Sequence, residues 1–295
     1  MIHVIINPIS GAGSDPCAAS RRASMVEAAA RRRGVGVTIG VTERHGHASE
    51  LGAAAVAAGA RGVIVWGGDG TFNEAAGALL GSSIPLGLVP AGSGNGLARA
   101  LGIPRDSLAA LNAAFDAPPR TIDAGRLAGR CFFNVAGVGF DARVAALFNQ
   151  RGPRSRGGWP YFAIGVREGC TYCALDYDVW LDDEPMRHRA LLIAFANGRE
   201  YGLGARIAPD ARLDDGLLDA IIVEERSVLA RFWHARHLAT GTAHLAPLVT
   251  TRRVRRAVIE SAGEMEYHVD GEPGRAYGRI EVEILPGALQ IRAET

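Results

Sequence analysis

The chain has 295 residues, of which 48% are hydrophobic and 21% charged, a balance that suits one large or two smaller globular domains. Its formal net charge of +1 gives no strong basic field, so nucleic acid is not an expected partner. All 32 residues in the Lys+Arg count are arginine. The lack of lysine excludes a Walker-type phosphate loop, a protein-kinase fold and Schiff-base chemistry. Any bound phosphate must therefore be held by backbone N–H groups, arginine or a metal ion.

The sequence also bears on the compartment of the protein. It opens directly on a short apolar strand and has no stretch of about 18 uninterrupted apolar residues, so neither a signal peptide nor a membrane span is expected. The pair Cys170-x-x-Cys173 lacks the second pair that zinc needs and the strand-to-helix context of a redox pair. Reduced thiols in a cytoplasmic protein are the expectation.

Short apolar strands alternate with helices in the first third of the chain. Gly34 and Gly59 stop two of the helices, as glycine commonly does at a helix C-terminus. Near-continuously apolar strands separated by helices are typical of a parallel sheet covered on both faces. The expected elements are a strand His3–Ile6, a helix Pro16–Arg33, a strand Val35–Val41, a helix Ala48–Ala58, a strand Gly62–Trp66, a helix Thr71–Leu80, a strand Leu86–Val89 and a helix Leu97–Leu101.

Short strands bounded by turn residues dominate after Pro118-Pro119. Two helices interrupt them, Phe140–Phe148 and the amphipathic Ser227–Ala239. The sequence therefore predicts an α/β domain with a parallel sheet over residues 1–120 and an antiparallel β-sandwich over residues 121–285. The expected strands are Tyr177–Leu181, Leu191–Ala196, Leu217–Val223, Arg255–Glu260, Met265–Val269, Ile280–Leu285 and Leu289–Arg292.

The most informative motif is Gly67-Gly68-Asp69-Gly70-Thr71-Phe72-Asn73-Glu74, where a buried strand ends, glycines turn the chain and a helix begins. Glycines let a phosphate approach the backbone, and a helix N-terminus presents unpaired N–H groups. Asp69 is not expected to bind phosphate directly, because two anions repel, and instead suits water or Mg²⁺. The alternative interpretation is an ordinary strand–helix turn in which Thr71 caps the helix.

Two further loops have the same character. Asn7-Pro8-Ile9-Ser10-Gly11-Ala12-Gly13 follows the first strand, and Pro90-Ala91-Gly92-Ser93-Gly94-Asn95-Gly96 follows a later one. In a parallel sheet such loops gather at the carboxyl edge, where ligands bind. They would bring the hydroxyl groups of Ser10, Thr71 and Ser93 together in a chain that has no lysine.

These three loops, with the late Asp270-Gly271-Glu272, occur in an order that resembles the diacylglycerol kinase catalytic family. That family includes bacterial soluble lipid kinases and the sphingosine and ceramide kinases. The resemblance spans nearly the whole chain and implies an N-terminal α/β nucleotide domain, a C-terminal β-sandwich for the lipid, and ATP and Mg²⁺ as donor and metal. It also implies that residues 286–295 return to the N-terminal domain.

The resemblance implies a nucleotide site and a catalytic base. The base would be Glu272, which takes the proton from the lipid hydroxyl, with Asp270 as a second candidate; the alternative interpretation of Asp270-Gly271 is a simple hairpin turn. The sequence departs from many bacterial members at Gly96, where they have aspartate, which leaves a strict diacylglycerol assignment open. The residues implied to contact the nucleotide are Asn7, Ser10, Gly11, Thr42, Gly67, Gly68, Asp69, Gly70, Thr71, Phe72, Asn73 and Ser93.

A structural Mg²⁺ is implied in the acidic segment Asp210–Asp219. The resemblance assigns its ligands to the Asp215 side chain and to the carbonyl groups of Arg212 and Leu217, and oxygen ligands suit this hard cation. The alternative interpretation is a solvated turn capped by aspartates.

Two segments are candidates for contact with a membrane surface. Arg151–Phe162 mixes three arginines with three aromatic residues, which suits lipid headgroups, and a mobile loop is the alternative. The apolar stripe of Ser227–Ala239 is ordinarily core-facing, and His234 and His237 on it are read as surface residues. The predicted partners are thus ATP and a membrane lipid bound peripherally, and the sequence leaves a homodimer open.

The sequence therefore predicts a lipid kinase that transfers the γ-phosphoryl group of ATP to a diacylglycerol- or sphingosine-like lipid. One alternative is an NAD kinase, since NAD kinases share a Gly-Gly-Asp-Gly loop and a β-rich second half. Another is a non-catalytic nucleotide sensor on the same fold.

Overall fold

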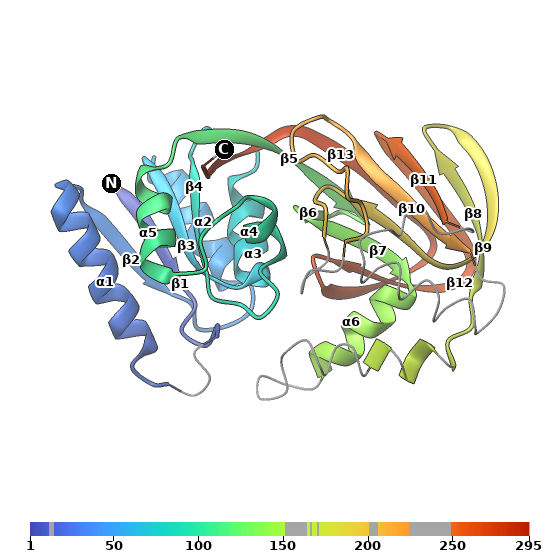
Figure 1. The fold of residues 1–295 in the computed structure, drawn as a ribbon, viewed down its shortest axis with the longest axis horizontal. Helices are drawn as coiled ribbons and strands as arrows, with labels where there is room; N and C mark the ends of the chain where they lie inside the picture. The colour runs from blue at the N-terminus through green and yellow to red at the C-terminus, as the bar shows by residue number, and fades with distance from the viewer. Residues whose placement is uncertain are drawn as a thin grey trace. The chain divides into compact units, whose positions relative to one another are not determined.

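The computed structural model describes residues 1–11, 15–150, 164–165, 167–169, 171–200, 206–224 and 249–294. The chain divides into two compact units, Met1–Ile122 with Gly287–Thr295, and Asp123–Pro286 (Figure 1). The sequence analysis placed the boundaries after residues 120 and 285. The predicted surface segments Arg151–Phe162 and Ser227–Ala239 lie outside the described residues.

The first unit alternates strands and helices, as predicted. Its third strand is buried at every position, which is the pattern of a strand covered on both faces. The elements are β1 (Ile2–Ile6), α1 (Ala18–Arg33), β2 (Val37–Val41), α2 (His47–Ala57), β3 (Gly62–Gly67), α3 (Asp69–Leu79), β4 (Leu86–Pro90), α4 (Gly96–Ala100), α5 (Ser107–Asp116) and the end of β13 (Glu272–Arg292).

The sheet of the first unit is parallel throughout. Its strand order is β13-β4-β3-β1-β2, with Ile5 opposite both Gly40 of β2 and Val65 of β3. The last residues of β13 complete the sheet, because Ile291 pairs with Leu86 of β4. The carboxyl ends of β1, β3 and β4 therefore lie at one edge.

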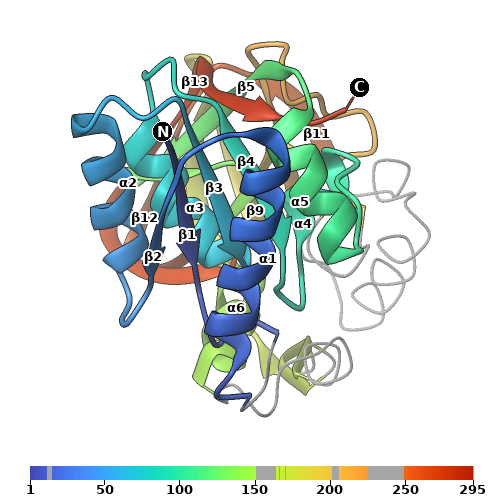
Figure 2. The ribbon, with the colours of Figure 1, turned by 90° about the vertical axis from the view of Figure 1, so that its left-hand side faces the viewer.

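Helices cover both faces of this sheet (Figure 2). Helices α1 and α5 pack together, and α2 packs along α3. The connection β1–α1–β2 runs across the sheet in the opposite direction to β2–α2–β3. Right-handed crossovers then put α1 and α2 on opposite faces, so the strand order itself explains the two layers. None of the helices among the described residues is long and apolar enough to cross a membrane.

The second unit is an antiparallel β structure, as predicted. Its strand order is β11-β10-β9-β7-β12-β13, while β8 pairs with β12 and β9, and β5 pairs with β13 and β6. The long strand β12 pairs with β8 near its start and with β7 near its end. Its elements are the end of β5 (Pro119–Leu127), β6 (Arg130–Phe132), β7 (Val135–Gly139), α6 (Phe140–Gln150), β8 (Leu175–Leu181), β9 (Glu184–Ala196), β10 (Leu218–Glu224), β11 (Val249–Val254), β12 (Arg256–Val269) and most of β13.

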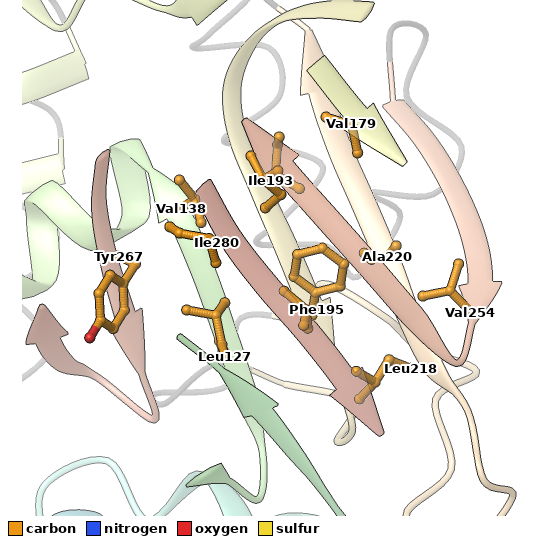
Figure 3. Close-up of a cluster of buried hydrophobic side chains, with 14 of the residues drawn as sticks. Leu127, Val138, Val179, Ile193, Phe195, Leu218, Ala220, Val254, Tyr267 and Ile280 are labelled. Atoms are coloured by element: carbon orange, nitrogen blue, oxygen red, sulfur yellow. The ribbon is translucent and has the colours of Figure 1, made fainter. Parts of the chain in front are cut away.

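Alternating side chains of these strands form the core of the second unit (Figure 3). In β13, Ile280, Val282 and Ile284 are buried, while the glutamates between them are exposed. Phe195 of β9 and Leu218 of β10 are fully enclosed in the same cluster. The alternation of apolar and charged residues in β13 thus matches the burial of one face of the strand.

The predicted elements were incomplete, because β5, β6, β7 and β11 were not among them, and three further details were wrong. Helix α5 was missed, although Asp106 accepts the N–H of Ala109 at 2.8 Å as an ordinary N-cap. Arg255–Glu260 and Met265–Val269 are one strand, because a bulge between Glu260 and Glu264 absorbs the intervening small residues. Likewise the Pro286-Gly287 step, which resembles a break, lies inside the continuous strand β13.

Candidate functional site

Three loops of the first unit meet at the carboxyl edge of its sheet, as predicted. The Nδ2 group of Asn7, after β1, donates to Oγ1 of Thr71 in α3 at 2.7 Å. The N–H of Ala91, after β4, donates to the carbonyl group of Gly67 at 2.8 Å. The loops that follow β1, β3 and β4 are therefore tied directly to one another.

The backbones of these loops approach so closely that side chains are excluded. A Cβ on Gly11, which has φ of +64°, would lie 2.1 Å from the carbonyl oxygen of Ala91. A Cβ on Gly92 would lie 2.8 Å from Cα of Gly68. The glycines that the sequence put in the phosphate site thus leave a surface built largely of main chain.

Helix α3 begins at Asp69, with Gly68 as its N-cap. The alternative prediction, that Thr71 caps this helix, is wrong, because Thr71 lies inside the first turn. Helix geometry provides no acceptor within the helix for the N–H groups of its first turn. Such N–H groups, with the positive end of the helix dipole, make an anion site of the kind that suits a phosphate chain.

The Asp69 carboxylate is held in place by the loop after β4. Its Oδ2 atom accepts the N–H of Asn95 at 2.8 Å. Asn95 has a left-handed backbone, with φ of 49°, and its amide group accepts from the N–H of Gly92 and donates to the Gly92 carbonyl. A fixed carboxylate beside a helix N-terminus of this kind is chemically suited to Mg²⁺ and its waters.

The remaining side chains of the predicted nucleotide site differ in exposure. Ser93 is exposed, whereas Ser10 and Thr42 are buried. Thr42 follows β2, and its N–H donates to the carbonyl group of Ile6 at 2.9 Å, next to Asn7. These groups lie in or beside the three loops.

Two other members of the predicted set lie on α3. The side chain of Phe72 is 2% exposed, and its N–H donates to Gly68, so this residue anchors the helix in the core rather than presenting a contact surface. Asn73, one residue further on, is half-buried.

Arg22 holds the first loop, a role that the sequence analysis missed. Its guanidinium group donates to the carbonyl groups of Asn7 and Ser10 and lies over the Trp66 ring, 5.7 Å from the centroid. Burial lowers the pKa of Arg22 somewhat from its ordinary high value, and the charge of Arg21 adds to this effect. Nothing in a run of helical arginines distinguishes the one that caps a loop.

Glu74, the last residue of the glycine-rich motif, also has a structural role. Its carboxylate accepts the N–H groups of Gly46 and Ala48 at 2.9 and 3.2 Å, and it pairs with the His45 ring at 2.6 Å. It therefore caps the N-terminus of α2 from the neighbouring helix and fixes the loop that follows Thr42.

In the second unit, Glu272 follows a tight turn. Asp270 and Gly271 have φ of 49° and 87°, and Val269 pairs with Glu272, so the hairpin turn predicted from Asp-Gly is confirmed. Glu272 is half-buried. Among the residues that the structure describes, none donates a hydrogen bond to its carboxylate.

Asp270, the second candidate base, is engaged differently. Its carboxylate accepts three consecutive backbone N–H groups, from Phe133, Asn134 and Val135, at 2.8, 2.9 and 3.1 Å. Its own N–H donates to the carbonyl group of Val135 at 2.9 Å. Asp270 therefore fastens the turn to the segment before β7.

A pocket of about 430 Å³ lies beside the Glu272 turn, between α6 and the β12–β13 hairpin. Glu266, in its wall, pairs with Arg143 at 3.2 Å and with Arg275 at 3.6 Å. The pocket thus combines small apolar side chains with a charged cluster. Its lining residues are Ala142, Ala146, Asn149, Gln150, Glu266, Pro273, Gly274 and Arg275.

The predicted metal segment is a tight acidic turn. Asp215 Oδ1 accepts the N–H of Leu217 at 3.1 Å, and Asp123 Oδ2 accepts that of Gly216 at 2.7 Å. The exposed Arg212 side chain pairs with Asp214 at 3.4 Å. The described part of the chain has no group of three or more His, Cys, Asp or Glu side chains that could hold a metal ion.

The pKa of Asp219 depends on the negative charge of this segment. Burial raises the pKa of Asp219, Arg253 counteracts the rise, and the carboxylates of Asp215 and Asp210 add to it. A divalent cation bound here would reduce the repulsion between these carboxylates. One carboxylate, together with carbonyl and water oxygens, is a ligand set that suits Mg²⁺.

Comparison with known proteins agrees with this architecture. Residues 1–127 match the model of the diacylglycerol kinase catalytic domain, and residues 134–293 match that of the YegS C-terminal NAD kinase beta sandwich-like domain. This chain belongs to the diacylglycerol kinase catalytic family. The family resemblance stated from the motifs is thereby confirmed.

Individual relatives extend over most of the chain. A "Probable lipid kinase YegS-like" of Chromohalobacter salexigens is 32% identical, covering 89% of this chain and 86% of that protein. A "Diacylglycerol kinase" of Mycobacterium tuberculosis H37Rv is 34% identical, covering 98% of this chain and 94% of that protein.

Solved structures share the fold. The structure of a diacylglycerol kinase from Bacillus anthracis Sterne has a TM-score of 0.74 at 20% identity, covering 99% of this chain and 96% of that one. An NAD kinase from Archaeoglobus fulgidus in complex with ATP has a TM-score of 0.55 at 14% identity, and the match covers 99% of this chain and 93% of that one. At such identities the likeness concerns the fold alone.

Proposed function

We propose that this protein is an ATP-dependent lipid kinase that transfers the γ-phosphoryl group of ATP to a hydroxyl of a diacylglycerol- or sphingosine-like lipid. The observation that carries the proposal is the set of three strand-end loops joined by the Asn7–Thr71 and Asp69–Asn95 hydrogen bonds. In a lysine-free chain of this family, that main-chain surface supplies the groups that phosphates need.

The first unit would bind and orient the nucleotide. The N–H groups at the start of α3 and the hydroxyl groups of Thr71, Ser10 and Ser93 would bind phosphate oxygens. Asn7, Gly11, Thr42 and the glycines of the loops would shape the site, as the family resemblance implies. Asp69 would hold Mg²⁺ through water, and Mg²⁺ when bound supplies positive charge to the β- and γ-phosphate oxygens.

Glu272 would act as the general base. Its half-buried carboxylate has no donor among the described residues, so its oxygen lone pairs are available for an alcohol proton. The lipid hydroxyl oxygen would form a bond to the γ-phosphorus as its proton passes to Glu272. The bond from that phosphorus to the β–γ bridging oxygen would break, and ADP would leave.

The lipid would be presented at a membrane surface. We infer a cytoplasmic enzyme that associates peripherally with the bilayer and takes its substrate from there. A second Mg²⁺ would bind Asp215 with the carbonyl groups of Arg212 and Leu217 and would stabilise the turn before β10.

Transfer of label from [γ-³²P]ATP tests the function. The protein, Mg²⁺ and labelled ATP are incubated with vesicles containing diacylglycerol, with vesicles containing sphingosine, and with NAD. Label in a lipid supports the proposal, and label in NAD alone would refute it. ATP binding, detected as a thermal shift, with no transfer to any acceptor would make the protein a nucleotide sensor.

Substitution of the base completes the test. Glu272→Gln is expected to lower turnover about 10²–10⁴-fold, the usual contribution of a general base. The thermal midpoint should stay unchanged, because no described residue donates to this carboxylate. Wild-type turnover in this variant would show that another group accepts the proton.

A further inference from the structure

The turn that carries Glu272 is fastened on three sides within the second unit. The Asp270 carboxylate accepts three N–H groups of residues 133–135. Asn149, near the end of α6, donates to the carbonyl group of Gly271 at 3.0 Å. The N–H of Gly271 donates to Nδ1 of His268 at 3.2 Å. The third contact involves a histidine that the sequence analysis did not single out.

His268 pairs with a buried carboxylate. Its Nε2 atom lies 3.2 Å from Oδ2 of Asp141, which is in the first turn of α6. His268 is 3% exposed and Asp141 is 6% exposed. Buried ionisable groups are uncommon unless they are paired, so this arrangement is specifically built.

A glycine makes room for the pair. Gly137 of β7 lies opposite His268 of β12 in the strand register. A Cβ on Gly137 would lie 2.1 Å from Oδ2 of Asp141, so any larger residue would push the carboxylate away. Three elements, β7, α6 and β12, therefore cooperate to bring Asp141 to His268.

The contacts define which nitrogen of the imidazole carries the proton. Nδ1 accepts the N–H of Gly271 and must have a free lone pair. A neutral His268 then has its proton on Nε2 and donates it to Asp141. The other oxygen of Asp141, Oδ1, accepts the N–H of Ala142 at 2.8 Å, which fixes the rotation of the carboxylate.

Two tyrosines lie in the same electrostatic environment and stay neutral. Burial raises the pKa of Tyr177 to about 12, and the charge of Asp141 adds to the rise. Burial, then Tyr177 and Asp141, raise the pKa of Tyr172. The buried phenols of both tyrosines therefore add no charge beside the His268–Asp141 pair.

We propose that His268 and Asp141 are a positioning pair for the catalytic base: Asp141 holds His268 in the tautomer whose Nδ1 accepts the Gly271 N–H, and this fixes the turn that orients Glu272. The inference rests on the proposed function, because it assigns a role relative to Glu272. It identifies a carboxylate–imidazole pair that acts on the base through the backbone and touches no substrate.

Asp141→Asn tests the pair with almost no change in shape. The Oδ1 atom of the new amide can still accept the N–H of Ala142, which leaves its NH₂ group facing Nε2 of His268. Nε2 must then accept, so the proton moves to Nδ1, where it opposes the N–H of Gly271. We expect turnover to fall about 10²-fold, the scale of a small misplacement of a catalytic group, at an unchanged KM for ATP.

The tautomer is read directly. In ¹⁵N NMR spectra of the wild-type protein, His268 should show the Nε2–H form, and in Asp141→Asn the Nδ1–H form. The matched control is Glu224→Gln, which makes the same chemical change in another histidine–carboxylate pair of this unit, His188 Nδ1 with Glu224 Oε1 at 2.8 Å. The control should keep wild-type turnover.

Two substitutions of the histidine keep the test decisive if Asp141→Asn folds poorly. His268→Asn places an amide oxygen near the position of Nδ1 and can accept the Gly271 N–H. His268→Gln reaches only the position of Nε2. We expect turnover to be higher in the asparagine variant than in the glutamine variant, and equal loss in both would contradict the proposal.

The outcomes separate this inference from the proposed function. An inverted tautomer with wild-type turnover, in a protein that Glu272→Gln inactivates, would overturn the positioning pair and leave the base intact. A wild-type tautomer in Asp141→Asn would also overturn the pair. Wild-type turnover in Glu272→Gln would instead remove the base and with it the proposed role of the pair.

Discussion

Substituting Thr71 by valine removes one hydroxyl from the proposed phosphate site and keeps the shape of the side chain. Oγ1 of Thr71, which is 8% exposed, accepts from Nδ2 of Asn7 at 2.7 Å. The Asn7 amide cannot turn to compensate, because its Oδ1 atom accepts the N–H of Ile9 at 3.1 Å. In Thr71→Val the Nδ2 group would therefore face a methyl group.

The structure sets the size of the effect. Leaving a buried donor unpaired costs about 1–3 kcal/mol. Asn7 is only half-buried, so water offsets part of the loss and the free energy of unfolding should fall by about 1 kcal/mol. If the hydroxyl also donates to a phosphate of ATP, a loss of about 1.4 kcal/mol in binding raises KM for ATP about tenfold.

Urea unfolding and ATP-dependent kinetics measure the two effects separately. Thr71→Ser is the control, since it keeps the hydroxyl and loses only a methyl group. Equal unfolding midpoints and equal KM values for wild type and Thr71→Val would refute the reasoning that this bond organises the loops. A serine variant as impaired as the valine variant would assign the loss to the methyl group.

Two further predictions concern the acidic segment Asp210–Asp219. Mg²⁺ at 100 times its Kd should stabilise the wild-type protein by about 2.7 kcal/mol. Asp215→Asn should lose this stabilisation, whereas the control Asp214→Asn, at an exposed residue paired with Arg212, should keep it; equal Mg²⁺ effects in both variants would contradict the site. Asp219 has a raised pKa in the folded state, so the native protein binds more protons than the unfolded chain and loses stability as pH rises from the ordinary carboxyl range through the folded pKa. Asp219→Asn should therefore be more stable than wild type at pH 7, and the difference should shrink toward pH 4. Thermal midpoints of both proteins measured between pH 4 and pH 7 test this, and a difference that grows toward pH 4 would contradict it.

The sequence predicted the parallel sheet because its strands are apolar at nearly every position. Gly62–Trp66 was predicted within one residue of β3, which is buried throughout. Segments with a weaker hydrophobic pattern were harder to predict. Helix α5, rich in alanine, was missed although Asp106 signals its start. The register bulge in β12 depends on its partner strand, which local sequence does not specify.

The candidate site likewise has a part that could be predicted from the sequence and a part that could not. The glycines and hydroxyl groups of the loops were identifiable because they follow strands that end at one edge. The groups that hold the loops were not. Arg22 acts through carbonyl groups more than ten residues away, and His268 and Asp141 are separated by 127 positions. Such pairs exist only once the fold brings them together.

The contacts also distinguish two neighbouring carboxylates that the sequence left as alternatives. Asp270 and Glu272 belong to the same Asp-Gly-Glu motif. The oxygens of Asp270 already accept three N–H groups, which gives this carboxylate a structural role. Asp69 and Glu74 likewise accept backbone N–H groups and hold loops. Glu272 accepts from no described residue, so it is the carboxylate of the motif that retains the lone pairs that proton transfer requires.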